Sequence, residues 1–177
     1  MQLLFPEGGD VGIAIKANGV NYTYKYDTDG SWKTSNYTAL TDTATWDKPS
    51  TAAPFAAFKT VKDAIRSKTG TELTVAIMNS YTFNLLSKTD AVKNRYLTTN
   101  GLSLGYLTDA EVKAVVESTS GLRIAIYDKQ YRDESKVAHA FVPNGYVCLI
   151  PDGALGGTWY GTTPEEADLR GASSACL

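Results

Sequence analysis

The chain has 177 residues, of which 43% are hydrophobic and 20% charged, and it carries a net charge of −2 at pH 7. This balance excludes a disordered tail and a fibrous repeat, and a chain of this length can bury roughly 70% of its unfolded surface without disulfides or metals. Lysines and arginines are scattered among acids, so no basic stripe indicates nucleic acid as a partner.

The first third of the chain is predicted to be β-structure. Residues 11–16 and 20–26 alternate in side-chain character on either side of an Asn-Gly pair, a pattern typical of a β-hairpin. The β-branched and aromatic residues suit a pleated, half-buried surface. Residues 38–51, rich in Thr, Asp, Ser and Pro, are predicted to be a loop that contains Trp46.

A helix is predicted to begin at Pro54 and to run to about Lys68, with Gly70 placed to cap its end. Its charged residues lie mostly away from one apolar stripe. The stripe consists of Phe55, Phe58, Val61 and Ile65. This spacing predicts a helix that packs one face against a core.

Residues 73–78 are predicted to form a strand, after which Asn79 or Ser80 caps a further helix. The apolar residues of that helix are Tyr81, Leu85 and Leu86. The polar stretch 88–100 is predicted to be part helix and part loop.

The clearest local signal is a capping box formed by Thr108 and Glu111, in which each side chain satisfies the other's backbone amide. Leu107 and Val112 flank it in the positions of a hydrophobic staple. The helix that follows is predicted to end near Gly121.

The remaining elements complete a mixed pattern. A strand is predicted at 122–127, then a charged loop at 128–136 and a second hairpin pairing 137–142 with 146–150. A last short helix is predicted to begin at Thr163. Strands and helices interleave without regular βαβ repetition, so we predict an α+β fold with a mixed sheet and helices packed on it.

One formal catalytic pattern is present. Residues 101–105 match G-x-S-x-G around Ser103, and Asp128 and His139 follow in the order used by α/β-hydrolases. That chemistry needs the serine on a sharp turn between a buried strand and a helix, and the residues before this pattern do not form a buried strand. A serine hydrolase is therefore kept only as a minor alternative.

The sequence patterns that partly match phosphate-binding, nucleotide-binding and metal-binding motifs are each incomplete. The Gly-rich stretches 8–12 and 153–157 lack the Lys-Ser/Thr of a P-loop and the strand-to-helix context of a dinucleotide site. Residues 27–30 match the start of a calcium loop without its later ligands, so a turn is predicted there. Cys148 and Cys176 have no metal-type spacing, and there is one histidine. We predict no catalytic, cofactor-binding or metal-ligating residues and no enzyme activity.

An aromatic-rich segment near the start of the chain leaves two interpretations open. These rings can form a sugar-binding platform, or they can pack within the protein or against a neighbouring subunit. The residues are Tyr22, Tyr24, Tyr26, Trp32, Tyr37 and Trp46. We favour packing or a subunit interface and keep a carbohydrate-binding module as the alternative function.

The order of several segments over most of the chain indicates a protein family. These segments are 46–49, the helix 55–68, 70–79, the helix with Leu85 and Leu86, the helix near Glu111, 121–128, 141–151 and 160–165. From about Gly9 onward this series resembles the lambda-type major capsid (head) protein family of tailed bacteriophages. In that family a tryptophan and a short loop lead into a long spine helix, and an axial domain with a mixed sheet and flanking helices follows.

The resemblance implies a division of the chain. Residues 1–70 would be the part of the peripheral domain with the β-hairpin and spine helix, 71–150 the axial domain, and 151–177 a return segment to the peripheral domain. Family members carry an N-terminal arm and an extended loop before the corresponding segment and a further strand after it, so the resemblance implies that this sequence is a fragment.

The resemblance also implies a function. The chain would be a structural subunit of a phage or prophage icosahedral capsid, found in the virion and, during assembly, in the bacterial host cytoplasm. Its partners would be copies of itself in pentameric and hexameric capsomers, with scaffold, decoration and portal proteins as further candidates. No cofactor, sequence-specific nucleic acid or membrane is expected as a partner. The expected contact loops are 88–100 and 128–136, which are polar and lie between regular elements.

Overall fold

A three-stranded mixed sheet forms the centre of the protein, in a computed structural model that describes residues 11–17, 20–100, 107–132 and 135–153. The central strand β3 (Val75–Met78) pairs in parallel with β4 (Arg123–Ile126) and antiparallel with β7 (Val147–Ile150). Ala76 and Met78 on β3 are fully buried. The predicted α+β class with a mixed sheet is confirmed.

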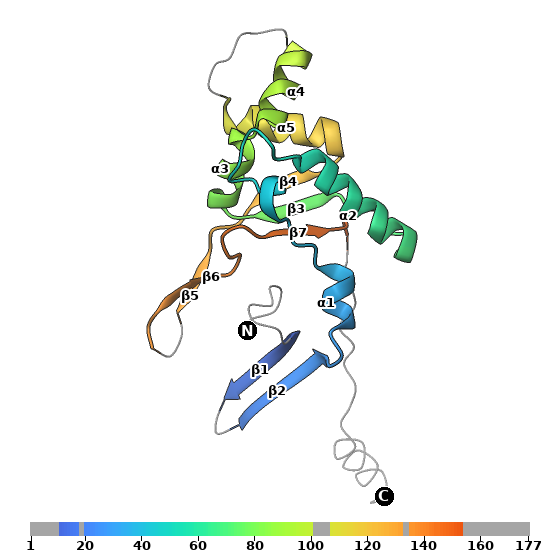
Figure 1. Ribbon diagram of the computed structural model, residues 1–177. Helices are drawn as coiled ribbons and strands as arrows, with labels where there is room; N and C mark the ends of the chain where they lie inside the picture. The colour runs from blue at the N-terminus through green and yellow to red at the C-terminus, as the bar shows by residue number, and fades with distance from the viewer. Residues whose placement is uncertain (1–10, 18–19, 101–106, 133–134, 154–177) are drawn as a thin grey trace, which may run out of the picture.

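Four helices pack on this sheet, and in Figure 1 they lie above it. They are α2 (Pro54–Thr69), α3 (Ser80–Lys88), α4 (Asp90–Asn100) and α5 (Asp109–Ser120). Fully buried core side chains come from three helices and the segment before β4, namely Phe83, Leu86, Val92, Val112, Val116 and Leu122. Burial of such side chains contributes about 1.5–3 kcal/mol each, so this cluster is the main source of stability.

The predicted helix ends are confirmed where the signal is local. Asn79 is the N-cap of α3, and its side chain accepts a hydrogen bond from the Thr82 amide. Thr108 and Glu111 form the predicted capping box at the start of α5. Gly70 and Gly121 cap the ends of α2 and α5 with φ of 69° each, a backbone conformation that glycine adopts at low cost.

The first hairpin is also confirmed, and it is followed by a short helix that was not predicted. Strand β1 (Val11–Ala17) pairs antiparallel with β2 (Val20–Asp27), and α1 (Ser31–Asn36) follows. The Asp27 carboxylate accepts hydrogen bonds of 3.0 Å from the amides of Trp32 and Lys33. The predicted turn at 27–30 is therefore confirmed, and its carboxylate holds the first turn of α1.

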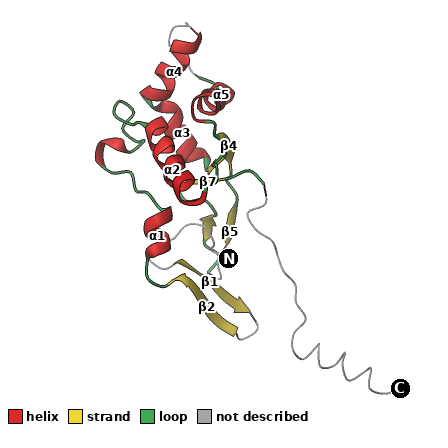
Figure 2. Ribbon diagram, turned by 90° about the vertical axis from the view of Figure 1, so that its right-hand side faces the viewer, coloured by secondary structure: helices red, strands yellow, loops and turns green. Residues whose placement is uncertain are grey.

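The predicted loop around Trp46 contains one short 3₁₀ turn, η1 (Asp42–Ala44). Trp46 itself is buried, and its ring packs edge-on against Phe58 of α2 with the ring centroids 5.6 Å apart. The loop therefore brings a core residue onto α2. Figure 2 shows that α1 and the hairpin of β1 and β2 lie below the other helices and the central sheet.

The prediction of part helix and part loop at 88–100 was right about the helix but wrong about the loop, because α4 is helical from Asp90 to Asn100. Val92 is fully buried, and the Tyr96 hydroxyl donates a 2.5 Å hydrogen bond to Glu111 of α5. Val92 and Tyr96 are four residues apart and so share a helix face. Packing of that face against α5 favours helix in a segment whose composition is otherwise polar.

The predicted hairpin between 137–142 and 146–150 was also wrong. Strand β7 pairs with β3, while β6 (Ala138–Ala140) pairs antiparallel with β5 (Gln130–Arg132), inside the segment predicted to be a loop. The turn between 142 and 146 is instead bound to the junction of β3 and α3, because the side-chain amide of Asn79 donates a hydrogen bond to the Val142 carbonyl.

The predicted helix from Thr163 lies outside the described residues. Within the described ranges, no helix combines the length and apolar character needed to cross a membrane.

Candidate assembly interface

A group of rings lies on one face of the hairpin made by β5 and β6; residues 128–141 are called the arm below. Tyr131 and His139 are direct cross-strand partners, and their rings stack with centroids 5.3 Å apart. The Phe141 ring lies 5.1 Å from that of Tyr131 and 6.1 Å from that of Tyr127, at the base of the arm. The rings form one continuous set because alternate residues of a strand share a face.

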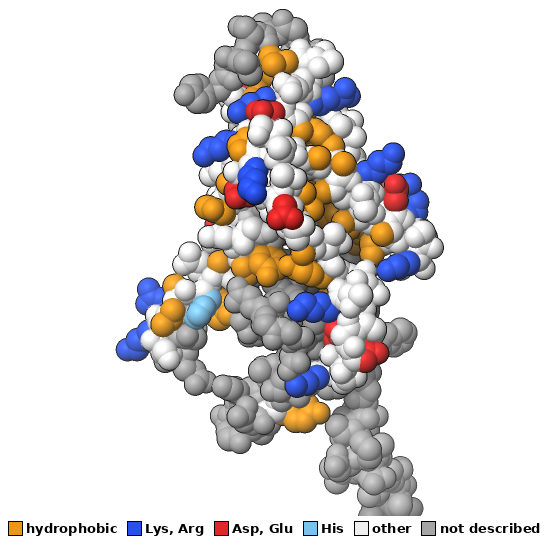
Figure 3. All heavy atoms as spheres, in the orientation of Figure 1, with side chains coloured by type: hydrophobic (Ala, Val, Ile, Leu, Met, Phe, Trp, Pro, Cys, Tyr) orange, Lys and Arg blue, Asp and Glu red, His pale blue; other side chains and the backbone are white. Residues whose placement is uncertain are grey.

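The aromatic face of the arm is open to solvent. Phe141 is 41% exposed and Val137 is 52% exposed, which are large values for apolar side chains. Lys129 places its ammonium 6.0 Å from the centre of the Tyr127 ring. Figure 3 shows hydrophobic and basic side chains together on this projection, and Figure 1 shows that the hairpin extends away from the sheet. Apolar side chains gathered on an exposed surface are typical of protein–protein contact sites.

The sequence reasoning missed this cluster, although a signal for it exists. Tyr127 and Tyr131 are separated by polar residues at period two, and His139 and Phe141 stand two apart on the other strand with an alanine between them. Period-two alternation predicts a shared strand face. The high charge of the segment suggested a loop and obscured this pattern.

Two members of the hydrolase-like pattern have other roles in the described structure. The Asp128 carboxylate accepts hydrogen bonds from the Ser80 amide at 2.8 Å and from the Ser80 hydroxyl. These two bonds, that from the hydroxyl first, lower the pKa of Asp128. His139 stacks on Tyr131 in an exposed strand. Ser103 lies outside the described residues.

A second exposed apolar surface surrounds α1. None of the residues of α1 is buried, and Trp32, Tyr37 and Leu40 are each about two-fifths exposed (42%, 42% and 37%). The Tyr37 ring lies 6.3 Å from that of Tyr146 in the turn before β7. Since Trp46 is buried, the sugar-platform interpretation loses one of its two tryptophans, and the remaining exposed rings suit an interface.

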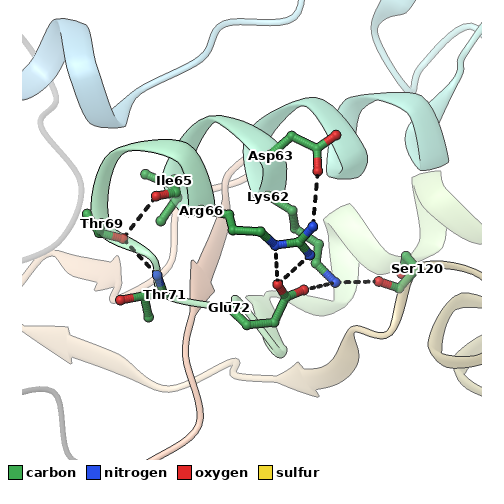
Figure 4. Close-up of polar contacts among 8 residues, drawn as sticks. All are labelled: Lys62, Asp63, Ile65, Arg66, Thr69, Thr71, Glu72 and Ser120. Carbon is green, nitrogen blue, oxygen red and sulfur yellow. Dashed lines mark hydrogen bonds and ion pairs between the residues drawn. The ribbon is translucent and has the colours of Figure 1, made fainter.

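A cluster of charges ties α2 to the segment that leads into β3 and to the end of α5 (Figure 4). The Lys62 ammonium is 2.8 Å from the Glu72 carboxylate and donates a 2.8 Å hydrogen bond to the Ser120 carbonyl. Arg66 pairs with the other Glu72 oxygen, and also lies 3.6 Å from Asp63. Hydrogen bonds from Lys62 and then Arg66 lower the pKa of Glu72, and Glu72 raises that of Arg66.

This cluster makes folding stability dependent on pH. A carboxyl whose pKa is lower in the folded protein stabilises it above the unfolded value and loses that contribution as the pH falls. For Glu72 the loss begins near pH 4.5, its ordinary pKa, and is complete below its lowered folded pKa. We expect the melting temperature to fall over this acid range, and to fall less in Glu72→Gln, as measured by circular dichroism. An equal fall in both proteins would show that Glu72 contributes nothing to the dependence.

No cluster of three His, Cys, Asp or Glu side chains suited to a metal occurs in the described part of the chain. Burial raises the pKa of the Cys148 thiol on β7, which disfavours the reactive thiolate.

Phage proteins of known structure resemble the fold of this chain. One is a phage-related protein from Bordetella bronchiseptica RB50, which is 14% identical, covers 72% of this chain and has a TM-score of 0.53. Another is a protein assigned as a prophage capsid protein from Escherichia coli CFT073, which is 18% identical, covers 80% of this chain and has a TM-score of 0.52. This chain spans 40% of the length of each. A search of curated proteins finds no match. The model of the family described as phage major capsid protein E matches residues 7–174, which is nearly the whole sequence. The chain therefore belongs to that capsid protein family.

Proposed function

We propose that this protein is a shell subunit of a phage or prophage icosahedral capsid, and that its copies associate into pentamers and hexamers that enclose the viral DNA. Membership of a major capsid protein family supports the structural role. The observation that carries the proposal is the exposed aromatic face of the arm, which suits contact with a neighbouring copy. Closed rings of one protein need two different faces that meet, and the surface around α1 is a candidate for the second.

The assignment of segments to two domains is part of this proposal. Residues 1–70 and 151–177 would belong to the peripheral domain, and 71–150 to the axial domain that faces the centre of a capsomer. The ion pairs between α2 and Glu72 support a fixed angle between the spine helix and the central sheet. Scaffold, decoration and portal proteins remain candidate partners, and the virion is the proposed location, with the bacterial host cytoplasm before assembly.

The arm is the contact whose loss should be easiest to measure. We expect Phe141→Ser to abolish or strongly reduce assembly, because it removes the ring that joins Tyr127 to Tyr131 on an exposed surface. Substitution of an exposed residue changes folding stability within about 0.5 kcal/mol, so the variant should melt like the wild type. Tyr81→Ser is the matched control, since Tyr81 is 53% exposed on α3 and contributes no ring to the set.

The measurement is negative-stain electron microscopy with sedimentation velocity on the complete protein expressed alone. Shells, tubes or rings from the wild type and from Tyr81→Ser, with dispersed particles from Phe141→Ser, would support both the function and the arm. A wild type that stays dispersed under assembly-promoting conditions would contradict the proposed function. Assembly of Phe141→Ser like the wild type would remove the arm from the contact and leave the function standing.

A further inference from the structure

The arm begins at a polar contact on the first turn of α3. Immediately before it, the Tyr127 amide donates a 2.9 Å hydrogen bond to the Met78 carbonyl at the end of β3. Asp128 then accepts from both the amide and the hydroxyl of Ser80, the first residue of α3. The incoming strand of the arm is therefore attached to the junction between β3 and α3.

The arm ends at the same turn. The Asn79 side-chain amide donates to the Val142 carbonyl at 3.1 Å and to the Asn144 side-chain oxygen at 2.7 Å. The Thr82 hydroxyl accepts a 2.9 Å hydrogen bond from the Gly145 amide and donates one of 2.7 Å to the Asn79 side-chain oxygen. The outgoing strand is thus attached through two side chains, and both are buried within the protein.

Among the described residues, these attachments join a small and exposed hairpin to the central sheet and α3. Its strands are three residues each, and a two-stranded hairpin of this size is marginally stable by itself. Most of the described residues of the arm are exposed, so packing on the helices contributes little to its direction. Asn79, Ser80 and Thr82 bind the first residue of the arm and the chain just after it, across 48 to 65 residues of sequence.

We propose that the first turn of α3 is a mount that sets the direction of the arm, with Asn79, Ser80, Thr82 and Asp128 as positioning residues. If the chain is a capsid subunit as proposed above, assembly needs the arm to be held in this direction and not merely to be present. Loss of one attachment should then loosen the arm while the central sheet stays protected.

Two substitutions test the two attachments separately. Asp128→Ala removes the acceptor for Ser80, and Thr82→Val keeps the side-chain volume while removing the hydroxyl that binds Gly145. We expect amide hydrogen exchange in β5 and β6 to rise about fivefold or more, the equivalent of roughly one hydrogen bond, with β3 changing less than about twofold. Asp47→Ala and Thr60→Val are matched controls, since both residues are exposed and lie away from the arm.

The outcomes separate the inference from the function on which it rests. Faster exchange confined to the arm, with absent or irregular particles by electron microscopy, would support the mount. Unchanged exchange in the arm, or an equal rise in β3, would overturn it. Shells like those of the wild type despite a loosened arm would overturn the link to assembly. If the wild type itself does not assemble, the proposed function fails, while the exchange measurement still decides whether the mount holds the arm.

Discussion

Replacing Phe83 by alanine is expected to lower the free energy of unfolding by about 3–5 kcal/mol. Phe83 is 1% exposed and belongs to the core cluster with Leu86 and Met78, where removal of the ring leaves a cavity that the helices cannot fill. Lys113 of α5 lies 5.7 Å above the ring and would lose that contact too. Domains of this kind have about 5–15 kcal/mol of total stability, so the variant should be close to unfolding at physiological temperature.

Chemical denaturation followed by tryptophan fluorescence measures this effect. Tyr81→Ala is the control, because it removes an aromatic ring two positions away on the same helix from a side chain that is 53% exposed. The control should change the free energy of unfolding by no more than about 0.5 kcal/mol. Similar losses in the two variants would show that α3 does not bury the face described above.

Val61→Pro is expected to cost about 3 kcal/mol or more, because proline inside a helix removes one backbone hydrogen bond and clashes with the preceding turn. Val61 is in the middle of α2, between Phe58, which packs on Trp46, and Lys62, which binds Glu72 and the Ser120 carbonyl. A kink at this position would disturb both contacts. The loss should therefore exceed the cost of the helix defect alone and abolish folding of much of the chain.

The control for this prediction is Val61→Ala, which keeps the helix and removes only a half-buried side chain. Far-ultraviolet circular dichroism during thermal melting compares the two. A Val61→Pro protein that melts like the wild type would show that α2 is not a continuous helix. A protein that retains its helix content but loses the acid dependence expected from Glu72 would place the damage at the ion pairs.

The two experiments address different parts of the proposed subunit. Phe83 tests the core that supports the sheet, whereas Val61 tests the helix that ion pairs attach to Glu72 and a hydrogen bond attaches to the end of α5. Neither residue lies on the arm. Their effects on assembly should therefore follow their effects on stability, in contrast to Phe141→Ser, which should affect assembly alone.

Features that depend on neighbours within about four residues could be predicted from the amino-acid sequence. The caps at Asn79 and Thr108 and the glycine ends of α2 and α5 follow from local backbone hydrogen bonds and from the conformational freedom of glycine. The apolar stripe of α2 and the order of segments that resembles capsid proteins were likewise present in the sequence. These features were enough to predict the α+β class and the family.

Tertiary structure alone decided the pairing of strands and the shape of the candidate interface. Residues 147–150 are as suitable for a local hairpin as for an edge of the central sheet, and pairing with β3 is favoured by buried contacts between distant segments. Asn79 illustrates the difference: its helix cap was predictable, but its bond to Val142, 63 residues away, was not. Because such bonds and the burial of Val92 form only after the chain folds, the full length of α4 and the attachment of the arm to α3 could not be read from local pattern.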